Sequence, residues 1–398
     1  MKHRRPEVAD IFAEHFESFD SSRHVPEPER RVARDLVACR TAALGGHVLE
    51  CSSCGHHEIS YNSCRNRHCP KCQAAARAKW LDARAEDLLE VPYFHVVFTL
   101  PAELAAIALQ NKRVVYGLLM RTAAKSLTLI GRDKKHLGAK LGVLAVLHTW
   151  GQTLMHHPHV HCVVPGGGLS PDGRSWVASR PNFLLSVRVL SRLFRRLMLE
   201  GLGELAARDG LELHGQLETL RAHRAWQDLM AKLRGKEWVV YSKPPFGGPV
   251  QVLKYLARYT HRVAIANSRL RPAPKGKVAF TWKDYAHGHR KKTMELEASE
   301  FIRRFLLHVV PPGFQRIRYF GFLSNRVRRP ALEKIRRLLG TPTPGSSPQD
   351  QQPDESAAID PMTRICPACK LRTLVVVAAP PSARRAPDKP IRNQGIPP

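Results

Sequence analysis

The stretch HHPHVHCVVPGGG, at residues 156–168, places four histidines within six positions. Successive side chains of a β-strand alternate between faces, so His157, His159 and His161 are expected to share one face. His159 and His161, separated by one hydrophobic residue, form the best-placed pair of metal ligands. Cys162 then faces the other side as a small buried hydrophobe. The three glycines are expected to end the strand and to let backbone or DNA pass close by.

A second group with chemical potential follows in LKYLARYTHR. Tyr255 and Tyr259 are spaced i,i+4 on a predicted helix and therefore share one of its faces. On its own, this spacing is also typical of an aromatic pair packed in a core beside a solvated basic stripe. Basic residues repeat at the same interval on the neighbouring face: Lys254, Arg258 and Arg262.

Together the two groups predict chemistry on a phosphodiester. A tyrosine hydroxyl can attack phosphorus if its phenolate is stabilised and the phosphate charge is neutralised. A divalent ion held by two imidazoles and a third ligand would polarise the non-bridging oxygens and orient the phosphate. The products would be a covalent 5′-phosphotyrosine and a free 3′-hydroxyl. The histidines alone also allow a three-histidine zinc-water site for hydrolysis, made of His157, His159 and His161.

The cysteines form a third group, in CSSCGHHEISYNSCRNRHCPKCQ. Two Cys-x-x-Cys pairs joined by a loop can close a tetrahedral thiolate site, which predicts a structural zinc ion bound by Cys51, Cys54, Cys69 and Cys72. A site with four sulfur ligands has no open position, so we assign it no catalytic role. Four further side chains in the span could replace one ligand: Cys64, His56, His57 and His68.

Basic residues lie between these cysteines, and we expect Arg65, Arg67 and Lys71 to present positive charge to DNA. A charged zinc loop that is merely solvated is the alternative. A further pair, Cys366 and Cys369 in ICPACK, has no two other cysteines near it in the sequence. We therefore assign this pair no metal.

Composition narrows the class of partner. The chain of 398 residues carries 63 Lys and Arg against 34 Asp and Glu, a formal net charge of +29, which favours a polyanionic partner such as nucleic acid. No stretch reaches the ~18 apolar residues of a transmembrane helix, and the N-terminus lacks the apolar core of a secretion signal. We expect a soluble bacterial protein of the cytoplasm, associated with the nucleoid, that has no membrane partner and no small-molecule substrate.

The elements that must position these groups indicate an α+β fold. Residues 1–91 read as helices around a metal-held loop, a small zinc-binding domain that contacts DNA. Residues 92–335 read as a catalytic domain with a central, mainly antiparallel sheet flanked by helices, and with a helical insertion at about 184–235. Residues 336–398 are rich in Pro, Ser and Gln and are expected to be a disordered tail.

At the level of motifs, HPHVHCVVPGGG with KYLARYTHRVAI resembles the class of HUH endonucleases, which combine a His-hydrophobic-His pair with a tyrosine helix. With YNSCRNRHCPKCQ, HTWGQTL and EFIRRFLLHVVPPGFQRIRYFGFL, the chain resembles the two-tyrosine transposases of the insertion-sequence 91 family over about residues 10–330. The resemblance implies rolling-circle transposition of single-stranded DNA, at the transposon ends and at a target.

Specific residues follow from the resemblance. It implies that Tyr255 and Tyr259 are the nucleophiles and that His159 and His161 bind the catalytic ion, Mg²⁺ or Mn²⁺. Related proteins often supply a third ligand upstream of the pair; Gln152 is the first candidate and His148 the second. The cysteine block implies a structural Zn²⁺. Two other functions remain open: a replication initiator or relaxase with the same chemistry, and a non-catalytic zinc-containing DNA-binding protein.

Overall fold

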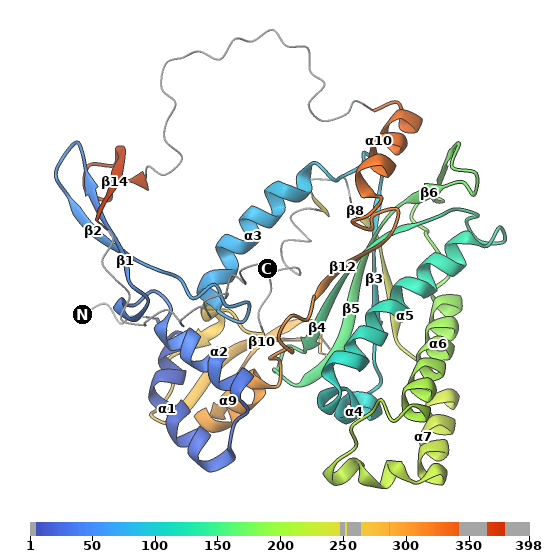
Figure 1. The fold of residues 1–398 in the computed structure, drawn as a ribbon, viewed down its shortest axis with the longest axis horizontal. Helices are drawn as coiled ribbons and strands as arrows, with labels where there is room; N and C mark the ends of the chain where they lie inside the picture. Colours follow the sequence, from blue (N-terminus) through green and yellow to red (C-terminus); the bar gives the residue numbers. More distant parts are fainter. Residues whose placement is uncertain (1–4, 247–250, 253–263, 286, 342–363, 379–398) are drawn as a thin grey trace, which may run out of the picture.

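The fold is organised around one antiparallel sheet. A computed structural model of the chain describes residues 5–246, 251–252, 264–285, 287–341 and 364–378. The mixture of helices and antiparallel strands confirms the α+β class (Figure 1). Within the described residues, no helix is both long enough and apolar enough to cross a bilayer.

Five strands make the central sheet, in the order β12 (Ile317–Gly321), β4 (Gly142–Trp150), β5 (His156–Pro165), β3 (Tyr93–Thr99) and β8 (Val240–Phe246). Every neighbouring pair is antiparallel. All nine residues of β4 are buried, which explains its continuous apolar sequence: protein covers both faces of this strand. The prediction of a central, mainly antiparallel sheet is thus confirmed.

Helices cover one face of this sheet (Figure 1). They are α4 (Ala105–Gln110), α5 (Lys112–Arg132), α6 (Val187–Ala207) and α7 (His223–Gly235). The largest core cluster joins them to alternate residues of the strands, including Ala145, Leu147, Val160 and Cys162. Cys162 is 0% exposed, so it is the small buried hydrophobe that alternation predicts.

The opposite face carries a smaller core cluster. Leu144, Val146 and Val163 project into it and meet residues of α10 (Arg328–Leu339). Trp80 of α3 (Pro70–Ala85) packs against the same cluster. Because side chains alternate, this is also the face of His148 and His161, which lie two residues from Val146 and Val163.

The N-terminal helices do not form a core of their own. Helices α1 (Val8–Arg23) and α2 (Glu27–Ala38) share one cluster with the hairpin of β10 (Lys277–Asp284) and β11 (Arg290–Glu297) and with α9 (Ala298–Leu306). Strand β9 (Leu270–Arg271) extends that hairpin. The rings of Phe12 and Phe305, for example, meet edge to face at 5.2 Å. The boundary expected at residue 91 therefore does not separate two cores, because residues after 264 complete the N-terminal one.

A second sheet brings the two ends of the described chain together. Its order is β13 (Arg364–Ile365), β14 (Arg372–Ala378), β1 (Gly46–Cys51) and β2 (His57–Tyr61). Strand β14 pairs antiparallel with β1 (Figure 1). Part of the tail that we expected to be disordered thus folds as two strands. Composition did not reveal them because their partner strand lies more than 300 residues earlier.

The glycines after β5 lie against protein backbone. Gly167 and Gly168 belong to β6 (Gly167–Leu169), which pairs with β7 (Trp176–Ala178). A Cβ on Gly168 would lie 2.5 Å from the carbonyl oxygen of Lys140, and one on Gly167 would lie 2.6 Å from that of Val177. The close approach expected of these glycines is therefore made by neighbouring strands.

Candidate metal centres and nucleic-acid surface

Three histidines converge on the face of the central sheet opposite α5. His148 of β4 and His159 and His161 of β5 bring nitrogen atoms within 4.8 Å of one another. His148 lies directly opposite His159 in the antiparallel register. The ring centroids of His148 and His161 are 4.4 Å apart, and those of His159 and His161 are 4.9 Å apart. The structure thus brings the predicted pair together and adds His148; three imidazoles so placed suit a divalent transition metal.

Hydrogen bonds at Nδ1 orient the rings of His159 and His161. Nδ1 of His159 lies 2.7 Å from the carbonyl oxygen of His157, and donation from Nδ1–H leaves the lone pair on Nε2. Nδ1 of His161 lies 2.8 Å from Nε2 of His95 on β3. Burial lowers the pKa of His95 to about 3, so its ring stays neutral at neutral pH. Such outer partners fix the tautomer and orientation of metal-binding histidines. No local pattern in the sequence singles out His95, because it lies on another strand.

The residues near the predicted histidine pair differ in whether they belong to the histidine cluster. His156 points toward α5, where its Nε2 lies 2.7 Å from the hydroxyl of Tyr116. Gln152 lies in the turn after β4, where its carbonyl accepts a hydrogen bond of 2.6 Å from Arg269. His148, stacked on Trp150 at 4.7 Å, belongs to the histidine cluster itself. The geometry favours His148 over Gln152 as the third ligand.

The turn between β4 and β5 is fixed by residues from elsewhere in the chain. His308 contacts both ends of it, with Nδ1 3.1 Å from Oγ1 of Thr149 and Nε2 3.0 Å from the carbonyl oxygen of Leu154. Arg304 of α9 donates to the carbonyl of Thr153 at 3.1 Å. These contacts set the register in which the two histidine-bearing strands leave the turn.

Acidification is expected to weaken this attachment. Burial lowers the pKa of His308 from 6.5 to about 3, so between these values the unfolded chain binds more protons and stability falls with pH. At about 1.4 kcal/mol per pH unit, wild type should lose roughly 2 kcal/mol more than His308→Gln between pH 6.5 and pH 5. Urea unfolding of both proteins at the two pH values measures this difference. Equal losses would contradict it.

The predicted tyrosine helix lies outside the described residues, as do its basic neighbours: Tyr255, Tyr259, Lys254, Arg258 and Arg262. The described residue Val252, however, is 0% exposed and packs in the cluster that contains Val146 and Val163. Val252 therefore lies on the histidine-bearing face of the sheet, three residues before the first tyrosine.

On the other side of the tyrosine segment, Ile265 belongs to a core that includes a residue of β4. Ile265, 1% exposed, packs in the cluster that contains Trp150. The Trp150 ring stacks on that of His148. Both flanks of the tyrosine segment thus pack in cores to which the histidine-bearing strands contribute residues.

Eight of the nine cysteines gather into two clusters of four, each with sulfur atoms within 4.8 Å of one another: Cys39, Cys64, Cys69 and Cys72, and Cys51, Cys54, Cys366 and Cys369. The single site predicted from the sequence, made of Cys51, Cys54, Cys69 and Cys72, is therefore divided between the two. The reason is that β1, which ends at Cys51, pairs with β14, away from the start of α3 (Figure 1).

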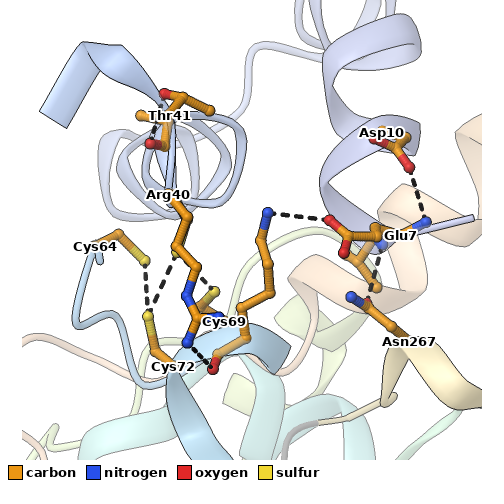
Figure 2. A network of polar contacts seen from close by, with 12 residues as sticks. Glu7, Asp10, Arg40, Thr41, Cys64, Cys69, Cys72 and Asn267 are labelled. Atoms are coloured by element: carbon orange, nitrogen blue, oxygen red, sulfur yellow. Dashed lines mark hydrogen bonds and ion pairs between the residues drawn. The ribbon is translucent and has the colours of Figure 1, made fainter. Parts of the chain in front are cut away.

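The first cluster joins α2, α3 and the loop between β2 and α3, residues 62–69, here called the zinc loop. Cys39 ends α2, Cys69 is the N-cap of α3 and Cys72 lies in the first turn of α3. The sulfur of Cys72 is 3.5 Å from that of Cys39 and 3.5 Å from that of Cys64. Figure 2 shows the sulfurs of Cys64, Cys69 and Cys72 turned toward one another. The N-terminus of a helix favours thiolates, and four of them suit zinc.

The electrostatics of this first cluster favour a bound cation. Hydrogen bonds from Cys64 and Cys69 lower the pKa of Cys39 to about 2. The neighbouring Cys39 in turn raises the pKa of Cys69 to about 12. Protein groups alone thus stabilise one thiolate at the expense of the others, whereas a divalent cation would allow all four to ionise.

The predicted DNA-contacting residues have different surroundings. Lys71 forms an ion pair of 3.0 Å with Glu7, so its charge is neutralised within the protein. Arg67 is half-buried and donates to the carbonyl of Phe314. Arg65 is exposed. Arg65 and Arg67 line a groove of about 670 Å³ beside β12, together with Gln73, Phe314, Gln315, Arg316, Ile317, Arg318, Tyr319, Phe320 and Asn325.

This groove adjoins the central sheet. The carbonyl of Arg316 accepts a hydrogen bond of 2.9 Å from the backbone of Leu147, the residue before His148. Burial lowers the pKa of Arg316 to about 10, which still leaves it charged at neutral pH. A groove with four arginines attracts phosphate, and the zinc loop and the sheet both contribute to it.

Comparison with known proteins decides the family. A family model described as "Transposase zinc-binding domain" matches residues 11–100, and one described as "Putative transposase" matches residues 142–331. "Putative transposase y4qJ" of Sinorhizobium fredii is 53% identical over 382 residues, which span 95% of this chain and 96% of that protein. The chain is a member of the insertion-sequence 91 family of transposases.

A more distant relative agrees. "Transposase for insertion sequence element IS801" of Pseudomonas savastanoi pv. phaseolicola is 31% identical over 319 residues, which span 79% of this chain and 75% of that protein. The first cysteine cluster of this transposase falls wholly within the zinc-binding match, and all three histidines of the cluster fall within the second match. A structural zinc site in the N-terminal region is thus supported by both family and geometry.

Proposed function

We propose that this transposase nicks and religates single-stranded DNA at the ends of its element through a 5′-phosphotyrosine intermediate and so drives rolling-circle transposition. The observation that carries the proposal is the convergence of His148, His159 and His161 on the sheet face where Val252 anchors the tyrosine segment. The family membership gives the substrate class, and the net charge of +29 suits a nucleic acid. Its place of action would be the bacterial cytoplasm, at the nucleoid.

In this proposal the tyrosine is the nucleophile. The oxygen of Tyr255 or Tyr259 attacks phosphorus, the bond from phosphorus to the 3′ oxygen breaks, and the proton lost by the tyrosine is balanced by one taken up by the 3′ oxygen. The energy of the phosphodiester stays in the protein–DNA bond, so a free 3′-hydroxyl can attack the phosphotyrosine and restore a DNA strand. Two tyrosines allow one strand end to be held while another is cleaved.

The histidine cluster would hold the divalent ion that this chemistry uses. A bound Mg²⁺ or Mn²⁺ would neutralise charge on the non-bridging oxygens of the scissile phosphate. Imidazole ligands favour Mn²⁺ over Mg²⁺. His95 would keep the ring of His161 oriented, and the backbone carbonyl of His157 would do the same for His159.

The arginine-lined groove would bind the flanking DNA. Arg65, Arg67, Arg316 and Arg318 can neutralise phosphates on the strand that leads to the histidine cluster. Lys71 would act indirectly, since its ion pair with Glu7 ties the start of α3 to the start of α1.

A covalent adduct tests the mechanism. The protein is incubated with Mn²⁺ and single-stranded oligonucleotides from both ends of the element that encodes it, and products are separated under denaturing conditions. Wild type should form a denaturation-resistant protein–DNA adduct, and the double variant Tyr255→Phe/Tyr259→Phe should form none. Tyr241→Phe, which changes an exposed tyrosine of β8, is the matched control and should behave as wild type. No adduct with wild type, or an adduct with the double variant, would refute the mechanism.

A further inference from the structure

Four cysteines from opposite ends of the chain meet where β1 lies beside β14. The sulfur of Cys51 is 3.6 Å from that of Cys369, and the sulfur of Cys54 is 3.7 Å from that of Cys366. We propose that these four cysteines bind a second structural zinc ion, which fastens residues 364–378, here called the C-terminal segment, to the N-terminal hairpin. Neither family match reaches this segment, since they end at residues 100 and 331.

The two cysteine pairs are presented by matching turns. In the first turn, the N–H of Gly55 donates to the carbonyl of Cys51 at 2.8 Å, and the N–H of Cys51 donates to that of His56 at 2.9 Å. In the second, the N–H of Lys370 donates to the carbonyl of Cys366 at 2.9 Å, and the N–H of Cys366 donates to that of Leu371 at 2.7 Å.

The matching extends to the backbone angles. The fourth residue after the first cysteine of each turn has a positive φ, +70° at Gly55 and +66° at Lys370. Lys370 adopts this left-handed conformation although it is not glycine, which costs about 1 kcal/mol or more. Two segments distant in sequence therefore fold into the same turn and face each other across one point. This repetition is expected of two halves of one metal site.

The spacing of the sulfurs fits a metal better than disulfides. A tetrahedron of sulfurs with Zn–S bonds of ~2.3 Å has edges of ~3.8 Å. The distances of 3.6 and 3.7 Å are close to this edge, whereas a disulfide requires ~2.05 Å. The hydroxyl of Thr373 lies 3.0 Å from the sulfur of Cys51 and can donate to its thiolate.

The sheet around this site needs a stabilising element beyond its apolar core. That core comprises Leu49, Cys51, Cys366 and Leu374, with Cys369 packed against it. Large hydrophobic residues of the same sheet stay exposed, among them Ile59 at 54% and Ile365 at 60%. So little buried area cannot compensate for the entropy lost when the C-terminal segment is ordered, and small units of this kind use metals or disulfides.

Zinc content tests the proposal. Wild-type protein, purified without added metal and with reductant present, should hold two zinc ions per chain by native mass spectrometry. Cys366→Ser/Cys369→Ser should hold one, and so should a chain that ends at Thr341. Cys162→Ala removes a cysteine outside both clusters and should keep two. Because Cys54 is exposed while Cys69 is 0% exposed, a chelator should remove the second zinc first.

Fragment association gives a second measurement on the whole protein. A protease site is introduced between residues 342 and 363. After cleavage, the C-terminal fragment should stay bound to the rest of the protein, and it should dissociate when the chelator removes the zinc ion of the second site. The proposal would be overturned if wild type held only one zinc ion, or if both the Cys366→Ser/Cys369→Ser variant and the chain that ends at Thr341 held two. Two disulfides in place of the four thiols in the reduced protein would also overturn it. The adduct assay above does not depend on this site, so the two proposals can fail separately.

Discussion

Replacing His161 by alanine is expected to slow strand cleavage by about 10³-fold, because the stabilisation of the phosphate by a bound ion is worth several kcal/mol and each 1.4 kcal/mol corresponds to tenfold. His161 is 8% exposed and is held by His95, so no other side chain can take its position without rearranging β3. Single-turnover cleavage of an end-derived oligonucleotide at several Mn²⁺ concentrations measures the effect. High Mn²⁺ should restore little of the rate.

Neighbouring residues supply the controls. His157→Ala changes an exposed histidine of the same strand and keeps the carbonyl that holds His159, so its rate should stay near that of wild type. His148→Ala should resemble His161→Ala, whereas Gln152→Ala should not, if His148 is the third ligand. A full rate for His161→Ala in a folded protein would exclude the histidine cluster from the chemistry.

Replacing Cys69 by serine is expected to destabilise the protein by more than about 4 kcal/mol, since it removes a ligand of a buried structural metal site. Cys69 is 0% exposed and belongs to the same core as Phe12 and Phe305. Loss of this metal should therefore affect both α1 and α9, rather than the zinc loop alone. Denaturant unfolding and zinc content measure the two consequences.

Two comparisons make this prediction specific. Cys162→Ala, a change at a fully buried cysteine away from both clusters, should cost less and keep the zinc content of wild type. Cys366→Ser/Cys369→Ser should leave the stability of the α1–α9 core unchanged. If Cys69→Ser keeps all its zinc and unfolds like wild type, the first cluster is not a zinc site.

Local periodicity was sufficient to predict the strand that carries His159 and His161. Alternation along residues 156–165 placed His159 and His161 on one face and Cys162 on the other, and the geometry of β5 agrees. These features depend on neighbours within a few residues, which is the range over which a sequence pattern carries information.

Partners distant in sequence could not be predicted in the same way. The predicted four-cysteine site combined the two Cys-x-x-Cys pairs that are nearest in the sequence. In the structure, Cys51 and Cys54 instead lie beside Cys366 and Cys369, because β1 pairs with β14, and no local pattern encodes that pairing. The matching spacing of Cys366 and Cys369 was the available signal. Cys39 carried none, because it lies at the end of an ordinary amphipathic helix. His95 likewise became visible only through the register of β3 against β5.

The separation of Cys51 and Cys369 also sets an order of events during synthesis. The two residues are 318 positions apart. At ~5–20 residues per second, a ribosome adds the second on the order of 15 to 60 s after the first. In the proposed second zinc site, Cys51 and Cys54 therefore leave the ribosome before the other two ligands and must stay reduced and soluble until the C-terminal segment follows. A chain truncated before the C-terminal segment would therefore carry an open thiol pair at Cys51 and Cys54.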